Sequence, residues 1–277
     1  MLAAIDIGSN SIRMATDSGI IRSTITKLAD GLQFTGKLSE TGIAVTEAAL
    51  RSYIDECRAL GCEKTIAFAT EAVRRAADGN DFIARIKKNI GLDIILLSHE
   101  QEAELALFGA DKPSGAVTVC DLGGGSLEVI SSPDGTRPDY VKSLPLGVVV
   151  LKNTFDGDYR KAIDTLPQTV SEYGEIQKRP VVISGGSACA IAAGILDLKV
   201  YDKTAVTRKF TAKQLDEFMP IALSPKLATF RPVCARRADT LPYGAIIIQA
   251  LLNHLNATEF HVSDAGNLDA IIKGYKI

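Results

Sequence analysis

The sequence lacks the features that mark several large classes of protein. No apolar run approaches the roughly 18 residues that a membrane-spanning helix requires. No basic segment precedes an apolar one at the start, as it would in a signal peptide. The net charge of −2 excludes a nucleic-acid-binding protein that relies on a general basic surface. The GxSxG, HExxH and GxxxxGKS/T motifs are absent. We therefore expect a cytoplasmic protein with no membrane and no nucleic-acid partner.

Cysteine and histidine are scarce and are not spaced as metal ligands. The five cysteines are odd in number, and the nearest pair, Cys57 and Cys62, lacks the CxxC spacing of a metal or redox site. We expect reduced cysteines, as in a cytosolic protein. The three histidines, His99, His254 and His261, also lack metal-ligand spacing, so each is expected to be structural.

Apolar residues are abundant enough for two full cores. The 277 residues are 46% hydrophobic, and no tract is biased in composition. Each half opens with strand, turn and strand and continues with alternating helices and strands, which predicts a duplicated α/β chain. The linker-like segment 111–115 predicts one lobe over 1–112 and a second over 113–277, and leaves open whether the last helix packs back on the first lobe. Among the predicted elements are strands at 2–7, 66–69 and 180–183 and helices at 46–60, 80–90, 161–177 and 239–255.

One strand–turn–strand motif occurs twice in the sequence. The stretch Ala4-Ile5-Asp6-Ile7-Gly8-Ser9-Asn10-Ser11-Ile12-Arg13 aligns without a gap on Val119-Cys120-Asp121-Leu122-Gly123-Gly124-Gly125-Ser126-Leu127-Glu128. In each copy an apolar strand delivers an Asp, and the Gly/Ser turn that follows lets backbone N–H groups approach phosphate oxygens. An ordinary hairpin is the alternative, but three consecutive glycines exceed what a hairpin needs. The two copies predict two lobes facing a cleft for polyphosphate and metal.

The alignment continues over 4–15 and 119–130, and the two copies differ in charge at the seventh residue after the Asp. Arg13 in the first copy would grip phosphate oxygens, and Glu128 in the second would help Asp121 hold Mg²⁺. For either residue alone, a surface charge on a hairpin is the alternative. The first copy is therefore interpreted as a substrate-binding wall and the second as a metal-binding wall.

Three further signals are weaker. The turn Ser184-Gly185-Gly186-Ser187 joins a buried strand to a helix N-terminus, which favours an anion, but such turns are common in α/β folds. The helix beginning at His99 carries three carboxylates, and the sequence does not single out one of them as a base. The pairs Arg74-Arg75 and Arg236-Arg237 are conspicuous, although isolated charge pairs are usually solvated helix faces.

Taken together, these motifs resemble the exopolyphosphatase / guanosine pentaphosphate phosphohydrolase (Ppx/GppA) family, in its short two-domain form. The matching motifs are AIDIGSNSIRM, ATEAVRRA, SHEQEAEL, VCDLGGGSLEVI, SLPLGVVVL, ISGGS, RRADTLPYGA and VSDAG, which span essentially the whole chain. The resemblance implies the duplicated actin-like (ribonuclease H-like, ASKHA) fold, with two lobes and an interdomain cleft. It also implies a homodimer.

The resemblance assigns roles to particular residues. It makes Glu102 the catalytic base and Asp121 and Glu128 the ligands of Mg²⁺, with Mn²⁺ as an alternative metal. In the mechanism that this suggests, Arg74 would hold phosphates further along the substrate. The glycine turns and the resemblance together predict the other phosphate-binding residues, which are Asp6, Gly8, Ser9, Asn10, Ser11, Arg13, Gly123, Gly124, Gly125, Ser126, Gly185, Gly186, Ser187, Arg236 and Arg237.

The sequence departs from the family pattern at three points. Leu127 stands where the family usually has Thr, which removes a hydroxyl contact. The ending SDAGNLDA replaces SDxGLREG and removes an Arg. The sequence also stops near the end of the two-lobe core and lacks the helical extension of the longer members.

These inferences predict a phosphohydrolase in which Glu102 activates water. Its predicted substrates are inorganic polyphosphate and pppGpp, which would connect it to the stringent response. A phosphotransferase or ATPase of the same fold is one alternative. A non-catalytic sensor that binds guanosine penta- or tetraphosphate is another.

Overall fold

The structure, a computed structural model, describes residues 1–277 and divides into two compact units. Unit 1 comprises residues 1–105 and 267–277, and unit 2 comprises residues 106–266. Each unit contains one mixed β-sheet covered by helices, so the predicted α/β class is confirmed.

The sheet of unit 1 has five strands in the order β3-β2-β1-β4-β5. Strands β1, β2 and β3 form an antiparallel meander, whereas β1, β4 and β5 run parallel. Their bounds are β1 (Leu2–Ile7), β2 (Ser11–Thr16), β3 (Ile21–Ile25), β4 (Lys64–Ala69) and β5 (Ile94–Leu96).

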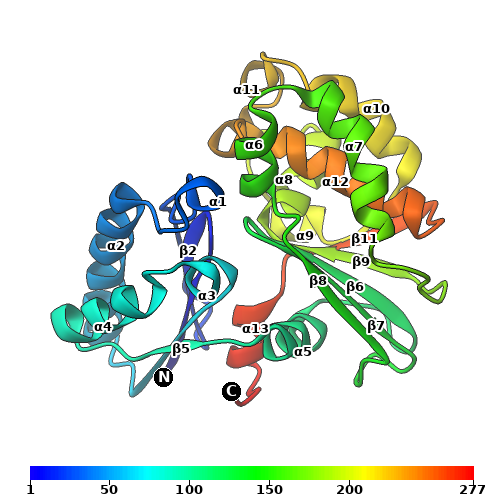
Figure 1. Ribbon diagram of the computed structural model, residues 1–277. Helices are drawn as coiled ribbons and strands as arrows, with labels where there is room; N and C mark the ends of the chain where they lie inside the picture. Colours follow the sequence, from blue (N-terminus) through cyan, green and yellow to red (C-terminus); the bar gives the residue numbers. More distant parts are fainter. The chain divides into compact units, whose positions relative to one another are not determined.

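Helices cover both faces of this sheet. Figure 1 shows α2 and α4 together on one face and α13 on the other. On the α13 face, Phe68, Leu97 and Leu105 form a buried cluster with Leu268 and Ile271. The helices of unit 1 are α1 (Leu32–Thr35), α2 (Glu40–Ala59), α3 (Glu71–Arg75), α4 (Gly79–Ile90), the first part of α5 (His99–Gly109), and α13 (Asn267–Ile272).

Unit 2 repeats the same arrangement and adds one strand. Its order is β10-β11-β9-β6-β7-β8, so β8-β7-β6-β9-β11 corresponds strand for strand to the sheet of unit 1. Again the first three strands form an antiparallel meander, and β6, β9 and β11 run parallel. The bounds are β6 (Val117–Leu122), β7 (Leu127–Ser132), β8 (Tyr140–Leu144), β9 (Val181–Ser184), β10 (Lys209–Thr211) and β11 (Glu259–Ser263). The duplication predicted from the repeated turn is therefore present in the topology.

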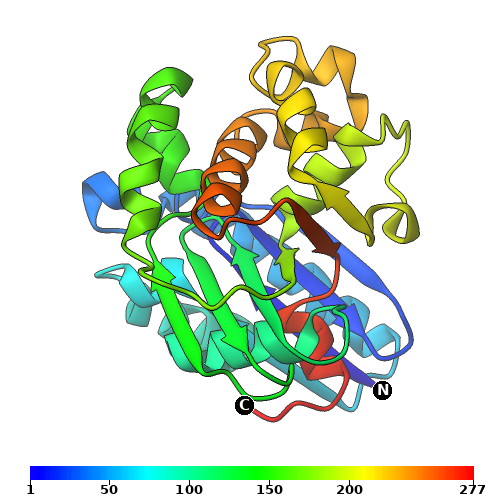
Figure 2. The ribbon, with the colours of Figure 1, turned by 90° about the vertical axis from the view of Figure 1, so that its right-hand side faces the viewer.

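The helices of unit 2 gather mainly on one side of its sheet (Figures 1 and 2). Helix α8 packs on β6, β9 and β11, and the apolar α12 packs on α6, α7, α8 and α10. The helices are α6 (Val148–Phe155), α7 (Tyr159–Ser171), α8 (Gly186–Ile195), α9 (Lys203–Val206), α10 (Ala212–Ala222), α11 (Leu227–Phe230), the 3₁₀ helix η1 (Pro232–Arg237) and α12 (Leu241–His254).

Two predicted helices have different bounds in the structure. The helix predicted over 46–60 begins earlier, at Glu40, because the Ser39 side chain caps it by accepting a hydrogen bond from the Gly42 N–H at 3.2 Å. The helix predicted over 161–177 ends at Ser171. Beyond that residue the Tyr173 hydroxyl donates to the Leu127 carbonyl at 2.6 Å, and Gly174 has a left-handed φ of 73°.

No helix of the structure is both long enough and apolar enough to cross a membrane.

Candidate functional site

The candidate residues of unit 1 lie on three segments at one edge of its sheet. Strands β1, β4 and β5 run parallel, so the segments that follow Ile7, Ala69 and Leu96 all leave from their carboxyl ends. In open α/β sheets this edge is where ligands usually bind. The three segments carry the first glycine turn, the Arg74 helix and the start of the acidic helix.

The first glycine turn is fixed by backbone hydrogen bonds. The Gly8 N–H donates to the Ser11 carbonyl at 3.1 Å, and the Ser9 carbonyl accepts from the Ala29 N–H at 2.9 Å. Asp6 on β1 lies directly opposite Arg13 on β2. Because opposed residues of an antiparallel pair project to the same face, the carboxylate and the guanidinium lie on one side of the hairpin.

The acidic helix α5 presents its three carboxylates in three different environments. Glu100 is exposed. Hydrogen bonds from its own backbone N–H and, to a smaller extent, from the Ser98 hydroxyl lower the pKa of its carboxyl. Glu104 is exposed and accepts a hydrogen bond from the Tyr275 hydroxyl at 2.5 Å. Glu102 alone is buried, with 5% of its surface exposed. The structure therefore distinguishes Glu102 from its neighbours, which sequence spacing could not do.

Arg74, on the neighbouring helix α3, holds the Glu102 carboxylate. Its Nη2 lies 3.1 Å from Glu102 Oε2 and 2.8 Å from Glu71 Oε2, and its Nη1 donates to the Leu97 carbonyl at 2.6 Å. Both carboxylate side chains are nearly excluded from solvent, with exposures of 6% for Glu102 and 11% for Glu71. One guanidinium thus serves two buried carboxylates, while the adjacent Arg75 is exposed.

The second glycine turn, in unit 2, reproduces the first. The Gly123 N–H donates to the Ser126 carbonyl at 3.0 Å, and Asp121 lies directly opposite Glu128. The Ser184 hydroxyl donates to Asp121 Oδ1 at 2.8 Å. The predicted equivalence of the two copies is therefore confirmed at the level of register, with Arg13 and Glu128 in matching positions.

Two glycines outside this turn allow neighbouring backbone segments to pack directly against it. A Cβ atom on Gly147 would lie 2.2 Å from the carbonyl oxygen of Gly124, and one on Gly185 would lie 2.3 Å from the carbonyl oxygen of Leu122. The N–H groups of Val148 and Val149, which follow Gly147, donate to the Gly123 and Gly124 carbonyls at 3.2 and 2.9 Å. The conformation of the turn is therefore imposed by the α6 and α8 N-termini as well as by its own sequence.

The Ser184-to-Ser187 turn leads into α8 and contacts one of the predicted arginines. A Cβ atom on Gly186 would lie 2.2 Å from Arg237 Nη2, so the Arg237 guanidinium lies against the backbone at the start of α8. Ser187 is buried. Arg236 is exposed, so the Arg236-Arg237 pair is split between solvent and this turn.

The predicted metal ligands form a pair rather than a cluster. Glu128 is buried, with 1% of its surface exposed, and its Oε1 accepts from the Ser143 hydroxyl at 2.7 Å. No group of three or more His, Cys, Asp or Glu side chains is arranged to hold a metal ion. Two carboxylates fit Mg²⁺, which keeps several waters and binds through one or two carboxylates plus substrate phosphates.

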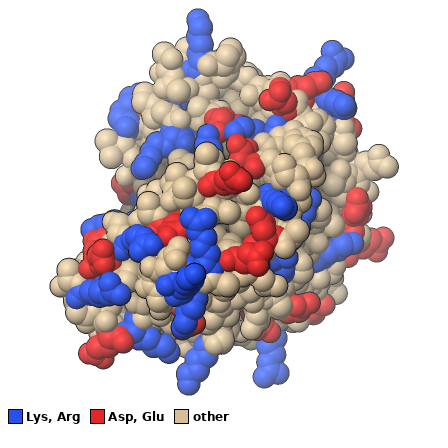
Figure 3. Space-filling view, turned by 60° about the vertical axis from the view of Figure 1, so that its left-hand side comes forward, with Lys and Arg blue, Asp and Glu red and all other residues tan.

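Charges of both signs are interspersed over the face shown in Figure 3. This agrees with the net charge of −2. An anionic substrate would therefore be recognised by local groups such as the glycine turns and their arginines, and not by a general basic field.

The departures from the family pattern have structural counterparts. Leu127 is fully buried. Asn267, in the divergent ending, is also buried, and its Oδ1 has no hydrogen-bond partner. All five cysteines are free thiols, as expected.

Two residues of the candidate site were missed by sequence reasoning. Glu71 and Gly147 lie within the motifs ATEAVRRA and SLPLGVVVL, but neither was assigned a role. A glycine directly before a helix and a carboxylate three positions before an arginine were the available signals.

Comparison with known proteins identifies the family. Residues 20–272 match the sequence profile of the Ppx/GppA phosphatase family. The chain belongs to this family. The resemblance inferred from the motifs is thereby confirmed, and with it the duplicated actin-like fold.

Three relatives of this Ppx/GppA phosphatase family member illustrate the match. Exopolyphosphatase 1 of Mycobacterium tuberculosis is 25% identical over 92% of this chain and 82% of its own length. A solved structure of the Aquifex aeolicus PPX-GPPA enzyme is 30% identical, the match covers 98% of both chains, and the TM-score is 0.76. An exopolyphosphatase from Cytophaga hutchinsonii, 16% identical over 99% of this chain and 98% of its own, shares the fold with a TM-score of 0.83.

Proposed function

We propose that this protein is a magnesium-dependent phosphohydrolase that releases the terminal phosphate of inorganic polyphosphate. The observation that carries the proposal is the duplicated device, an Asp and a glycine turn at the carboxyl edge of each sheet, together with the buried Glu102. The similarity to exopolyphosphatases supports polyphosphate as the substrate.

Glu102 is assigned the role of general base. Its carboxylate takes a proton from a water molecule as the water oxygen attacks the terminal phosphorus. The bond from that phosphorus to the bridging oxygen breaks, which yields inorganic phosphate and a chain that is one phosphate shorter. A positioned base typically contributes about 10²–10⁴-fold to the rate. Its burial keeps the carboxylate away from bulk water, and Arg74 fixes its orientation.

The glycine turns and the nearby arginines are assigned to phosphate binding. Transferred phosphoryl groups carry charge on three equatorial oxygens, and fixed N–H donors stabilise that charge without reorganising. Arg13 beside Asp6 and Arg237 against the α8 turn would add charge-assisted bonds to the phosphates.

Asp121 and Glu128 are the residues that would hold Mg²⁺ or Mn²⁺. When bound, the ion would neutralise charge on the phosphate oxygens. Ser184 orients the first carboxylate and Ser143 the second, so both are held by hydroxyl donors before any ligand arrives.

The contacts of Arg74 favour a positioning role in addition to its predicted role in phosphate binding. Its guanidinium already bonds to Glu71, Glu102 and the Leu97 carbonyl. In this proposal it orients the base and keeps a positive charge beside it.

Hydrolysis of the 5′-phosphate of pppGpp is the second candidate activity. It is included because the name of the matched family joins Ppx with GppA. The homodimer and the cytoplasmic location remain predictions.

The proposal is tested by phosphate release with Mg²⁺ from polyphosphates of defined length, from pppGpp and from ATP, in ¹⁸O-labelled water. Label in the released phosphate from polyphosphate or pppGpp supports hydrolysis. Consumption of ATP only in the presence of an acceptor, with no label in free phosphate, would indicate a phosphotransferase. Tight binding of guanosine tetraphosphate without turnover of any substrate would indicate a sensor.

A further inference from the structure

Unit 2 contains a cavity of about 740 Å³ at the opposite end of its sheet from the glycine turns. Its lining includes Pro180, Val181 and Glu259, which lie at the amino ends of β9 and β11. The glycine turns follow the carboxyl ends of β6 and β9, which run parallel. The four residues of β9 at about 3.3 Å each place the two features roughly 13 Å apart.

The cavity has the size and apolar walls of a small-molecule site. Small-molecule pockets in proteins usually measure about 300–1,000 Å³ and are lined mainly by apolar groups with a few polar ones. Leu255 and Ala257, which follow α12, form part of the wall with Pro113 and Pro180. All the lining residues belong to unit 2, so the cavity is complete within that unit.

The charged groups of the lining leave a positive excess. Glu259 is matched by Lys209, whose Nζ lies 3.0 Å away. Asp111 is then opposed by two lysines, Lys112 and Lys178, and Lys178 is exposed and makes no ion pair. The imidazole of His261, whose pKa is lowered by burial, adds an uncharged polar group at neutral pH. The net excess of one positive charge complements an anion.

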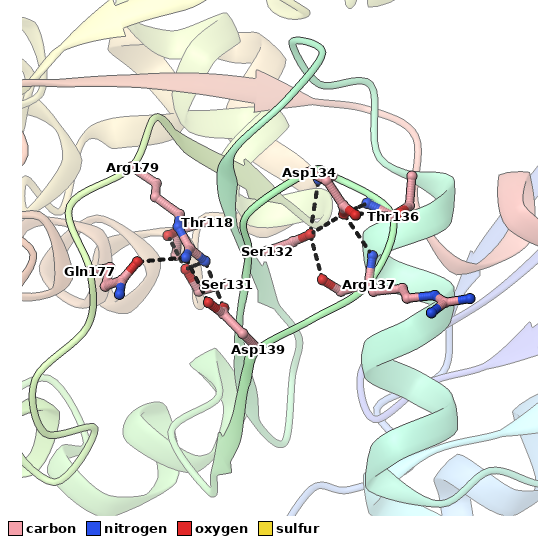
Figure 4. Close-up of polar contacts among 10 residues, drawn as sticks. Thr118, Ser131, Ser132, Asp134, Thr136, Arg137, Asp139, Gln177 and Arg179 are labelled. Carbon is pink, nitrogen blue, oxygen red and sulfur yellow. Dashed lines mark hydrogen bonds and ion pairs between the residues drawn. The ribbon is translucent and has the colours of Figure 1, made fainter.

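A buried arginine makes the wall beside Lys178 rigid. Figure 4 shows Arg179, on the segment that precedes β9, pointing toward Ser131 of β7 and Asp139 just before β8. Its guanidinium forms two parallel bonds of 2.6 Å to the Asp139 carboxylate and further bonds to Ser131 and Gln177, and only 7% of the side chain is exposed. Bidentate arginine–carboxylate pairs hold a fixed geometry. The segment from Lys178 to Pro180 is therefore pre-organised.

We propose that this cavity binds a small organic monoanion with an apolar body, such as an aromatic carboxylate or sulfonate. The apolar walls take the body of the ligand, and the exposed Lys178 takes its charge. The Lys112 ammonium, which donates to the Leu107 carbonyl, adds positive charge to the same wall. The site is separate from the residues assigned to phosphate release, so the inference stands independently of the proposed function.

The experiment uses the full chain and 8-anilinonaphthalene-1-sulfonate as the probe, because it combines a sulfonate with an apolar ring system. Thr258→Trp tests the volume, since Thr258 lines the cavity at an exposed position and only its backbone carbonyl, which accepts from Ala212 N–H, is used structurally. Lys178→Glu tests the charge. Lys226→Glu, an exposed lysine of unit 2 outside the cavity, is the matched control. Far-UV circular dichroism confirms that each variant is folded.

We expect calorimetry to give one probe molecule per chain, with affinity reduced by about tenfold or more in Thr258→Trp and in Lys178→Glu. The Lys226→Glu variant should bind like the wild type, and inorganic phosphate alone should not displace the probe. Wild-type affinity in both cavity variants would overturn the site. Displacement of the probe by low concentrations of phosphate would overturn the ligand class, because it would indicate a site for anions without an apolar body.

Discussion

Gly147 lies outside the second glycine turn but packs against it. Replacing Gly147 with alanine is therefore expected to push that turn out of position. The new Cβ atom would lie 2.2 Å from the Gly124 carbonyl oxygen and 2.4 Å from the Gly125 nitrogen. Both are backbone atoms, so no side-chain rotation relieves the clash. The backbone of Gly147 itself, with φ −94° and ψ 161°, is suitable for alanine, and the whole penalty therefore comes from the contact.

The expected loss of stability can be estimated from the hydrogen bonds between the two segments. Ordinary contact begins at 3.4 Å, so the two segments must separate by about 1 Å. The Val148 and Val149 bonds to the turn, at 3.2 and 2.9 Å, would then be lost. At about 0.5–1.5 kcal/mol each, the free energy of unfolding should fall by about 1–3 kcal/mol. The reduced entropy of the unfolded alanine chain offsets at most about 0.4–1 kcal/mol of this.

Urea unfolding followed by far-UV circular dichroism measures the stability, and phosphate release measures the activity. Gly266→Ala is the control, because its Cβ would meet nothing within 4 Å and its φ is not positive. The reasoning is refuted if Gly147→Ala matches wild type in both stability and phosphate release.

Three further predictions concern charge and burial. Arg74→Met leaves Glu71 and Glu102 without their shared cation, so the free energy of unfolding should fall by about 3–5 kcal/mol in urea titrations, and an unchanged value would contradict the role of this ion pair. The hydrogen bonds from Arg179 lower the pKa of Asp139 below its usual 3.8, so Asp139 stabilises the fold above that pH and loses this contribution as the pH falls. The stability difference between wild type and Asp139→Asn should therefore shrink on acidification below about pH 4, and parallel curves would contradict the assignment. Burial raises the pKa of the Cys57 and Cys234 thiols to about 11. A thiol reagent at about pH 8 should therefore modify the half-buried Cys62 first. Equal rates of modification for all three cysteines would contradict the burial of Cys57 and Cys234.

The sequence was most informative where local pattern determines structure. The gapless alignment of the two glycine turns correctly predicted that Arg13 and Glu128 occupy equivalent positions, because a hairpin of fixed length fixes its own register. The start of α5 is likewise set locally, because the Ser98 and Gln101 side chains each bond to the other residue's backbone N–H in a capping box.

Other features depend on residues that are distant in the sequence. The burial of Glu102 requires β4 and β5 to bring Arg74 and the Leu97 carbonyl to the same edge, which no local pattern indicates. The need for glycine at 147 arises only because the backbone of Gly124 packs against it. Helix α10 was missed although Thr211 and Gln214 form a capping box at its start, so a local signal was available there.

The central claim, that Glu102 acts as the base, is tested most directly by comparing Glu102→Gln with wild type for both catalysis and binding. The measurements are Mg²⁺-dependent phosphate release at saturating polyphosphate and polyphosphate affinity by calorimetry. The amide keeps the shape of the side chain, so we predict that kcat falls by about 10²–10⁴-fold while the affinity stays within a few-fold of wild type. An unchanged kcat would contradict the assignment of Glu102 as the base.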